Sequence, residues 1–144
     1  MIILDTNVIS EAMRANPNPI VLDWLRAQPI VELATTTITL AEIRYGLAHL
    51  RFGTRRRDLE TKFNSFVSRG LSDRTFDFDA AAAEAYGDLA VARERTGRRL
   101  EGFDGLIAAI AKSRGLPVAT RDRRDFADCG IPVVCPWQTP PIVY

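Results

Sequence analysis

Four acidic residues stand where the sequence predicts the ends of strands or the starts of helices. Asp5 follows a short apolar run at the start of the chain, and Asp122 follows a later predicted strand. Glu42 and Asp104 each lie in the expected first turn of a helix. In an open parallel α/β sheet, ligands bind beyond the carboxyl ends of the strands, where the strand order reverses. We therefore expect the four carboxylates to converge on one crevice.

Carboxylates gathered in one crevice repel one another, and burial raises their pKa values. A hard divalent cation removes this repulsion, because Mg²⁺ and Mn²⁺ prefer oxygen ligands. Mg²⁺ also keeps several bound waters, which a substrate phosphate could displace. The pattern therefore predicts a Mg²⁺ site, in which Mn²⁺ substitutes, built from Asp5, Glu42, Asp104 and Asp122.

Each acid, taken alone, also has a structural explanation. Asp5 could cap the helix that follows it, and Asp104 could complement a helix dipole. The segment Thr39-Leu-Ala-Glu42 matches a capping box, in which Glu42 serves its own helix. Asp122 could make an Asx turn. Separate caps have no reason to share one sheet edge, so the combination of all four favours a common site.

The elements expected to position these residues alternate between strands and helices. Runs of apolar and β-branched residues predict short strands over 2–4, 31–36, 75–78, 118–120 and 131–134. Apolar residues at helical spacing predict helices over 7–13, 17–28, 39–50, 55–69, 80–95 and 103–114. This alternation indicates an α/β fold with a mainly parallel sheet. The helices over 39–50 and 55–69 are consecutive and are expected to form a hairpin on one edge.

Length and composition place this chain among ordinary globular proteins. Its 144 residues, 47% of them hydrophobic and 26% charged, fit one domain over 1–144, with an irregular tail over about 136–144. Cys129 and Cys135 lack metal-ligand or redox spacing, which predicts reduced thiols in a cytoplasmic protein. No signal peptide or membrane span is recognisable, so no membrane partner is expected.

The charge balance argues against a chain that binds nucleic acid through overall basicity. Nineteen basic residues against 18 acidic residues give a formal net charge of +1. A local basic patch remains compatible with this sum. Arginine suits phosphate because its planar fork donates two hydrogen bonds, and arginines cluster in two places: 51, 55, 56 and 57, and 121, 123 and 124.

Four segments resemble the signature motifs of PIN domains, and most closely those of the VapC and FitB-like toxins of bacterial toxin–antitoxin pairs. They are Ile-Leu-Asp5-Thr-Asn, Thr-Leu-Ala-Glu42-Ile-Arg-Tyr-Gly, Asp104-Gly-Leu-Ile-Ala-Ala and Val-Ala-Thr-Arg-Asp122. Their order and spacing hold across nearly the whole chain. The resemblance implies a three-layer α/β/α fold with a central, mainly parallel, five-stranded sheet. It also implies Mg²⁺- or Mn²⁺-dependent endoribonuclease activity, a homodimer, and neutralisation by a small antitoxin.

We expect Asp5 and Asp104 to bind a first metal directly, while Glu42 and Asp122 complete the site through waters or hold a second ion. The number of ions stays open. Many relatives carry Asn where Asp122 stands, with an acid three residues later, and this chain has acids at both positions. We take Asp122 as the ligand and Asp125 as a substitute or supporting acid.

Water is the expected nucleophile, because no residue has the setting of a covalent nucleophile and His49 is the only histidine. A bound metal lowers the pKa of water and stabilises charge that develops on phosphate. Hydroxyl and amide groups near the acids are expected to orient ligands or phosphate, and one arginine is expected to contact phosphate. These supporting residues are Thr6, Asn7, Thr120 and Arg121.

Three other classes of protein share parts of this pattern. A haloacid-dehalogenase-type phosphatase begins with a strand that ends in Asp, but it needs a second Asp where Asn7 stands. A receiver domain needs a lysine at the end of a late strand, and Lys62 and Lys112 both fall within predicted helices. A metal-free regulatory module that only binds an antitoxin would use the acids as helix caps.

Overall fold

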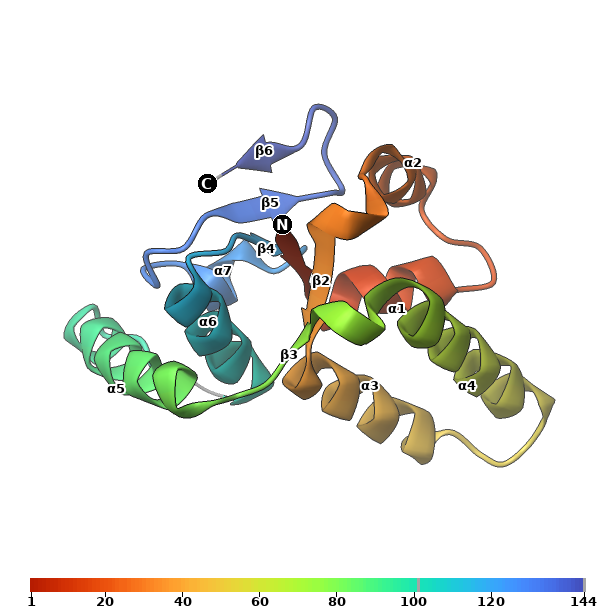
Figure 1. The fold of residues 1–144 in the computed structure, drawn as a ribbon, viewed down its shortest axis with the longest axis horizontal. Helices are drawn as coiled ribbons and strands as arrows, with labels where there is room; N and C mark the ends of the chain where they lie inside the picture. The colour runs from red at the N-terminus through yellow and green to blue at the C-terminus, as the bar shows by residue number, and fades with distance from the viewer. Residues whose placement is uncertain (101, 144) are drawn as a thin grey trace.

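The chain folds around a sheet whose strands lie in the spatial order β3-β2-β1-β4-β5-β6 (Figure 1). The computed structural model describes residues 1–100 and 102–143. The parallel strands are β1 (Ile2–Leu4), β2 (Leu33–Thr36), β3 (Thr75–Phe76), β4 (Val118–Ala119) and β5 (Val133–Cys135). The predicted five-stranded parallel sheet is therefore confirmed.

The C-terminal segment departs from the expected irregular tail. Residues Ile142–Val143 form β6, which pairs antiparallel with β5, so Val134 lies opposite Val143. The expectation for residues 136–144 is therefore wrong at these two positions. Two β-branched residues after a proline pair are enough to add a short edge strand once β5 offers an unpaired edge.

Helices connect the strands and cover both faces of the sheet. They are α1 (Thr6–Met13), α2 (Pro19–Ala27), α3 (Thr37–His49), α4 (Thr54–Phe66), α5 (Ala80–Arg95), α6 (Gly102–Arg114) and α7 (Arg123–Phe126). A π-helical turn, Val67–Leu71, extends α4, and 3₁₀ turns cover Ile30–Glu32 and Ser72–Arg74. In the described ranges, no helix is long and apolar enough to cross a membrane.

The sheet separates two hydrophobic cores, because successive side chains of a strand point to opposite faces. Ile3 of β1 belongs to the core formed with α5 and α6, whereas the next residue, Leu4, belongs to the core formed with α1, α2, α3 and α4. Figure 1 shows α5 and α6 on one side of the strands and α1, α3 and α4 on the other. This is the expected three-layer α/β/α arrangement.

The strand order reverses beside β1. Ile3 pairs with Ala34 of β2 on one side and with Val118 of β4 on the other. The chain first builds outward from β1 to β2 and β3, and it then returns to place β4 against the free edge of β1. The carboxyl ends of β1 and β4 therefore flank the crevice where ligands bind in such sheets.

Local signals set helix boundaries that differ from the expected ones. Thr36, not Thr39, caps α3, because the Thr36 hydroxyl accepts a hydrogen bond from the Thr39 backbone N–H at 3.0 Å. The capping-box interpretation of Glu42 is therefore wrong, and Glu42 lies beyond the first turn. At α2, Asn18 caps and Pro19 occupies the first helical position, where its missing N–H costs nothing.

Candidate active site

Asp5 is buried at the junction of β1 and α1, with only 2% of its surface exposed. Its Oδ1 accepts a hydrogen bond from the Thr6 backbone N–H at 2.7 Å, so Asp5 is the N-cap of α1. Its Oδ2 accepts hydrogen bonds from the Asn7 amide at 2.8 Å and from the Thr120 hydroxyl at 2.7 Å. Three donors from two segments thus fix the orientation of this carboxylate.

The Thr120 hydroxyl links the end of β4 to the start of α1. It donates to Asp5, and it accepts from the Asn7 side-chain amide at 2.9 Å and from the Asp122 backbone N–H at 3.0 Å. One donor and two acceptor sites are all that a hydroxyl has, so every one of them is used. Asn7 Oδ1 in turn accepts from the Arg121 backbone N–H at 3.1 Å. The expected supporting residues of β1 and β4 therefore form one connected network.

Glu42 reaches across to α1 instead of serving its own helix terminus. The Thr6 hydroxyl donates to Glu42 Oε2 at 2.5 Å, a bond between residues 36 apart in sequence. α3 thereby presents Glu42 beside the residue that follows Asp5. The structure brings Glu42, Thr6 and Asp5 together as the convergence of the acids predicted.

The electrostatics place Asp104 within the same group of acids. Burial raises the pKa of the Asp104 carboxyl to about 7, and neighbouring negative charges add to the rise. In decreasing order of effect, these charges belong to Asp5, Asp125, Glu42 and Asp122. Asp104 lies in the first turn of α6. The charges of four acids from three other segments of the chain therefore act on Asp104.

Asp5 has a raised pKa for the same reasons, but hydrogen bonds oppose the rise. Burial raises the pKa of Asp5 to about 6, and the charges of Glu42 and Asp122 contribute. The hydrogen bonds from Thr120 and Thr6 stabilise the ionised form and lower the pKa. Because of these donors, the Asp5 carboxyl ionises more readily than that of Asp104, the other acid with a strongly raised pKa.

Asp122 and Asp125 both belong to the segment that follows β4. Asp122 is the residue before α7, and its side chain makes no capping hydrogen bond to that helix. The Asx-turn interpretation of Asp122 is therefore not supported. Asp125 lies in α7, and its charge affects Asp104 more than the charge of Asp122 does. The structure thus places both acids near the site and gives Asp125 the stronger influence on Asp104.

The donor set fits a hydrated Mg²⁺ ion. Within residues 1–100 and 102–143, no three His, Cys, Asp or Glu side chains are grouped so that they could hold a metal ion directly. Mg²⁺ does not need such a cage, because it binds through one or two carboxylates and keeps several waters. Asp5 accepts three hydrogen bonds, and a carboxylate has about four lone-pair sites, so one site remains for a cation.

A groove of about 910 Å³ opens beside Thr6 and Glu42 between α1, α3 and α4. Basic side chains from three places on the chain line it: Arg14, Arg55 and Lys62. Arg121, which is expected to contact phosphate, has its guanidinium carbon 5.6 Å from the centre of the Trp137 ring, and its role at phosphate stays a prediction. The sequence did not identify Arg14 or Lys62 as site residues, since their closeness to Glu42 depends on how the helices pack.

The other predictions about reactive side chains can be compared with the structure. His49 is exposed in the last turn of α3, about two turns beyond Glu42, where its Nδ1 lies 3.0 Å from the Tyr45 carbonyl oxygen. Cys129 and Cys135 are both buried and unbridged, as expected for reduced thiols.

The fold and the acids at its strand ends define a known class. The family model of the PIN domain matches residues 2–131, and this chain belongs to the PIN-domain family. Its relatives include a VapC ribonuclease and a toxin. The VapC ribonuclease Y4jK of Sinorhizobium fredii is 41% identical over 96% of this chain and 99% of that protein. The toxin FitB of Neisseria gonorrhoeae is 36% identical, again over 96% of this chain and 99% of that protein.

A solved structure supports the fold in detail. The structure of FitAB bound to the IR36 DNA fragment contains a chain that superposes with a TM-score of 0.89 at 35% identity. The match covers 96% of this chain and 96% of that chain. The arrangement of layers and strands is therefore that of the FitB-like PIN toxins over nearly the whole length.

Proposed function

We propose that this chain is the toxin of a type II toxin–antitoxin pair, a Mg²⁺- or Mn²⁺-dependent endoribonuclease that hydrolyses RNA phosphodiester bonds in the cytoplasm. One observation carries the proposal: a buried Asp5, oriented by three donors, lies at the strand-order reversal of a PIN fold, where its charge and those of three further acids act on Asp104. The names of its relatives, a VapC ribonuclease and a FitB toxin, support RNA as the substrate and a toxin as the role.

Asp5 and Asp104 are the residues proposed to hold the metal, with Glu42 and Asp122 completing its environment through waters or holding a second ion. Asp125 is proposed as a supporting acid. When bound, the cation would supply a water of lowered pKa and would stabilise negative charge on the phosphate. The clustered acids favour such an ion, because it relieves the burial and repulsion that raise the pKa values of Asp5 and Asp104.

The protein's own contribution is orientation and charge. Thr120, Asn7 and the Thr6 backbone N–H hold the Asp5 carboxylate in one position before any ligand arrives. The Asp104 carboxylate accepts no side-chain or backbone hydrogen bond from residues 1–100 or 102–143, so it is available to a cation. The basic side chains along the groove provide contacts for the RNA backbone on either side of the scissile bond.

The competing enzyme class loses support at Asn7. In the phosphatase alternative, the residue at this position must act as an acid and a base. Asn7 cannot exchange a proton, and its amide donates to both Asp5 and Thr120. The non-catalytic alternative, a module that only binds an antitoxin, requires the acids to be helix caps. Among the caps that the described part of the chain shows, only Asp5 of the four predicted ligands is one.

The proposed activity should depend completely on divalent metal. We expect the purified chain to cut RNA in Mg²⁺ or Mn²⁺ and to stop in EDTA, since water near ionised carboxylates is a poor nucleophile without a cation. The measurement is RNA cleavage with each ion and with excess chelator. The Asp5→Asn protein, purified in parallel, controls for contaminating ribonuclease. Undiminished cleavage in EDTA would rule out the metal-dependent mechanism.

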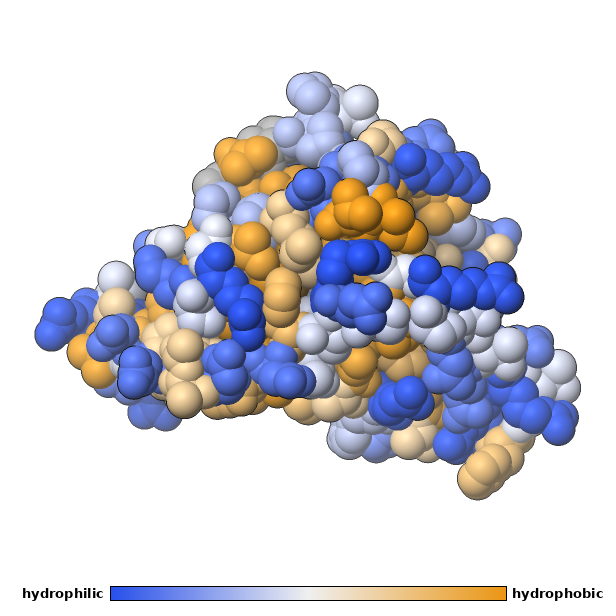
Figure 2. Space-filling view, in the orientation of Figure 1, coloured by the Kyte–Doolittle hydropathy of each residue, from blue (hydrophilic) through white to orange (hydrophobic). Residues whose placement is uncertain are grey.

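The family resemblance also supports two protein partners: a second copy of the chain and a small antitoxin. Figure 2 shows hydrophobic side chains gathered on the surface near α2. Exposed apolar residues of this part of the chain are Ile20, Ile30 and Val31. We expect an isologous dimer, which is the usual arrangement for two identical chains. Sedimentation at micromolar concentration should give twice the monomer mass of 16.0 kDa, and a stable monomer would contradict this prediction.

A further inference from the structure

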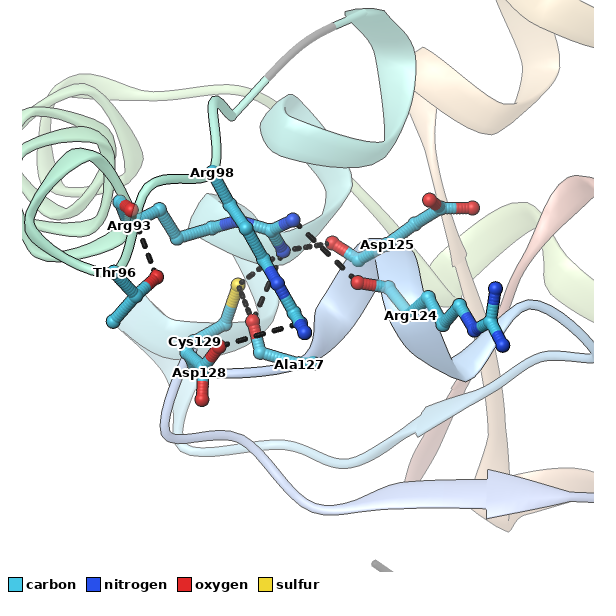
Figure 3. A network of polar contacts seen from close by, with 8 residues as sticks. All are labelled: Arg93, Thr96, Arg98, Arg124, Asp125, Ala127, Asp128 and Cys129. Carbon is cyan, nitrogen blue, oxygen red and sulfur yellow. Dashed lines mark hydrogen bonds and ion pairs between the residues drawn. The ribbon is translucent and has the colours of Figure 1, made fainter.

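Arg93 is a buried arginine whose guanidinium donates hydrogen bonds to backbone carbonyl oxygens of the turn over 124–129. It lies in α5, and 5% of its surface is exposed. Its Nη1 donates to the carbonyl oxygens of Asp125 at 2.5 Å and Ala127 at 3.0 Å, and to Cys129 Sγ at 3.7 Å. Its Nη2 donates to the Arg124 carbonyl oxygen at 3.5 Å. Figure 3 shows the guanidinium facing these groups.

This arrangement is an unusual way to place a cation in a protein interior. Burying a charge is costly unless it is paired and hydrogen-bonded. No carboxylate among the residues that the structure describes forms an ion pair with Arg93, and its Nε has no partner. An apolar side chain would fill the same space at lower cost to the free energy of folding. What the guanidinium adds is a set of directed hydrogen bonds.

The turn that receives these bonds has little structure of its own. α7 is one helical turn long, and a helix this short is not stable in isolation. Asp128, two residues beyond the end of α7, has a positive φ of 61°. The carbonyl oxygens of residues 124, 125 and 127 point inward to one guanidinium, which fixes their relative positions. Arg93 therefore stabilises a backbone conformation that the local sequence cannot hold alone.

Asp125 connects this turn to the acidic cluster. Its carbonyl oxygen is bound by Arg93, while its carboxylate points away from Arg93 in Figure 3. The helix that carries Asp125, α7, packs against α6, whose first turn holds Asp104, and the charge of the Asp125 carboxylate acts on Asp104. The neighbouring acid, Asp122, is held separately through the bond between its backbone N–H and Thr120. Arg93 thus fixes the backbone of Asp125, whereas Thr120 fixes the backbone of Asp122.

We propose that Arg93 is a positioning residue, which locks the turn over 124–129 and thereby sets the Asp125 carboxylate beside Asp104. This inference rests on the metal site of the proposed function, but not on RNA being the substrate. It assigns to α5, on the far side of α6 from the catalytic edge, a role in shaping the metal environment. It also gives Asp125 a defined place in the site, because Arg93, 32 residues earlier in the sequence, binds its carbonyl oxygen.

The test compares three variants by Mn²⁺ binding to the metal-free protein. Arg93→Met keeps an apolar stem but leaves the three carbonyl oxygens without their donor. We expect it to bind Mn²⁺ about tenfold more weakly, the loss typical when a group that supports metal ligands is removed. Arg93→Lys can reach some of the carbonyl oxygens and should restore part of the affinity. Arg98→Ala removes an exposed ion pair to Asp128 of the same turn and should bind as the native chain does.

Hydrogen exchange reports the turn itself. We expect the peptide over 122–130 to lose protection in Arg93→Met and to keep it in Arg98→Ala. A double-mutant cycle then asks whether Arg93 acts through Asp125: in an Asp125→Asn background, Arg93→Met should weaken Mn²⁺ binding little further. If Arg93 were merely structural, its replacement would either leave Mn²⁺ affinity unchanged or lower it by the same factor with and without Asp125→Asn.

Native Mn²⁺ affinity in folded Arg93→Met would overturn the proposal, and so would full additivity with Asp125→Asn. If Arg93→Met does not fold, Arg93→Lys decides: affinity equal to the native chain contradicts the proposal, and about threefold weaker binding with partial loss of exchange protection supports it. RNA cleavage is measured alongside. A native chain that binds Mn²⁺ but cuts no RNA would disprove the proposed function and leave the role of Arg93 intact.

Discussion

Replacing Asp104 by Asn is expected to abolish RNA cleavage and at the same time to leave the metal-free protein equally stable or more stable. The variant loses a proposed metal ligand, so we expect at least a hundredfold loss of rate. It also loses a carboxylate that burial and four neighbouring acids disfavour in its ionised form. We expect a gain of about 1 to 2 kcal/mol in the free energy of unfolding at pH 8, after allowing for solvent screening of this half-buried group.

The pH dependence follows from the direction of the pKa shift. The folded-state pKa of Asp104 is about 7, above the unfolded value of 3.8, so the folded chain binds this proton more tightly. The resulting stabilisation is fully present below about pH 4 and is lost as the pH rises through 7. The native chain and Asp104→Asn should therefore unfold alike near pH 4 and diverge toward pH 8. Metal-free thermal unfolding across this range measures the difference.

Two comparisons make the Asp104 test decisive. Mg²⁺ should raise the melting temperature of the native chain, by linkage to binding, and should raise that of Asp104→Asn much less. Asp79 provides a matched control, because its carboxylate caps α5 through the Ala82 backbone N–H at 3.0 Å. Asp79→Ala should lose about 1 kcal/mol and keep its cleavage activity. If Asp104→Asn instead melts lower in EDTA and responds to Mg²⁺ as the native chain does, Asp104 is structural.

The strand ends and the acids that follow them were predictable because they depend on short segments. A run of buried apolar residues ending in Asp5 identifies a strand end, and the alternation of strands and helices brings such ends to one edge. The hydrogen bonds around Asp5 were predictable in kind, since Asn7 and Thr120 stand next to the acids. Which of these groups would bond each other was not predictable, because Thr120 bonds Asn7 and Asp5, which precede it by 113 and 115 positions in the sequence.

Glu42 shows where a local pattern misleads. Both Thr36 and Thr39 are good N-cap residues, and only Thr39 is followed by an acid at capping-box spacing. The structure uses Thr36, since β2 ends there and its extended backbone provides the cap conformation. Glu42 is then released to bind the Thr6 hydroxyl. The proposed site role of Glu42 does not depend on the cap. It rests on Glu42 lying near a helix N-terminus that faces the carboxyl ends of the strands, and it stays a prediction.

Arg93 could not have been found from the sequence. An arginine near the end of an alanine-rich helix has the pattern of a solvated residue that complements the helix dipole. Its burial depends on a turn that lies more than 30 residues later, whose carbonyl oxygens it binds. The choice between Asp122 and Asp125 as the fourth ligand stays a prediction for a similar reason. Their spacing along the chain does not show that separate anchors bring both acids into range of Asp104.

Replacing Thr120 by Val should damage the site without changing its shape. Thr120 is fully buried, and its hydroxyl bonds Asp5, Asn7 and the Asp122 backbone N–H. Valine keeps the branched side chain but leaves those three groups without this partner, so we expect a loss of about 2 kcal/mol in stability. Mn²⁺ affinity and RNA cleavage should each fall roughly 10- to 100-fold, because Asp5 loses the group that orients it.

The direction of the Asp5 pKa separates this effect from general destabilisation. The Thr120 hydrogen bond lowers the pKa of Asp5, so its removal should raise that pKa further above the present value of about 6. Mn²⁺ binding by Thr120→Val should therefore weaken progressively as the pH falls through this raised pKa and should recover in part at pH 8, where Asp5 ionises. Thr75→Val, in the edge strand β3, removes a hydroxyl that donates to the Leu71 carbonyl oxygen at 2.8 Å. This control should lose stability with no change in Mn²⁺ affinity, and equal losses of affinity in the two variants would contradict a specific role for Thr120.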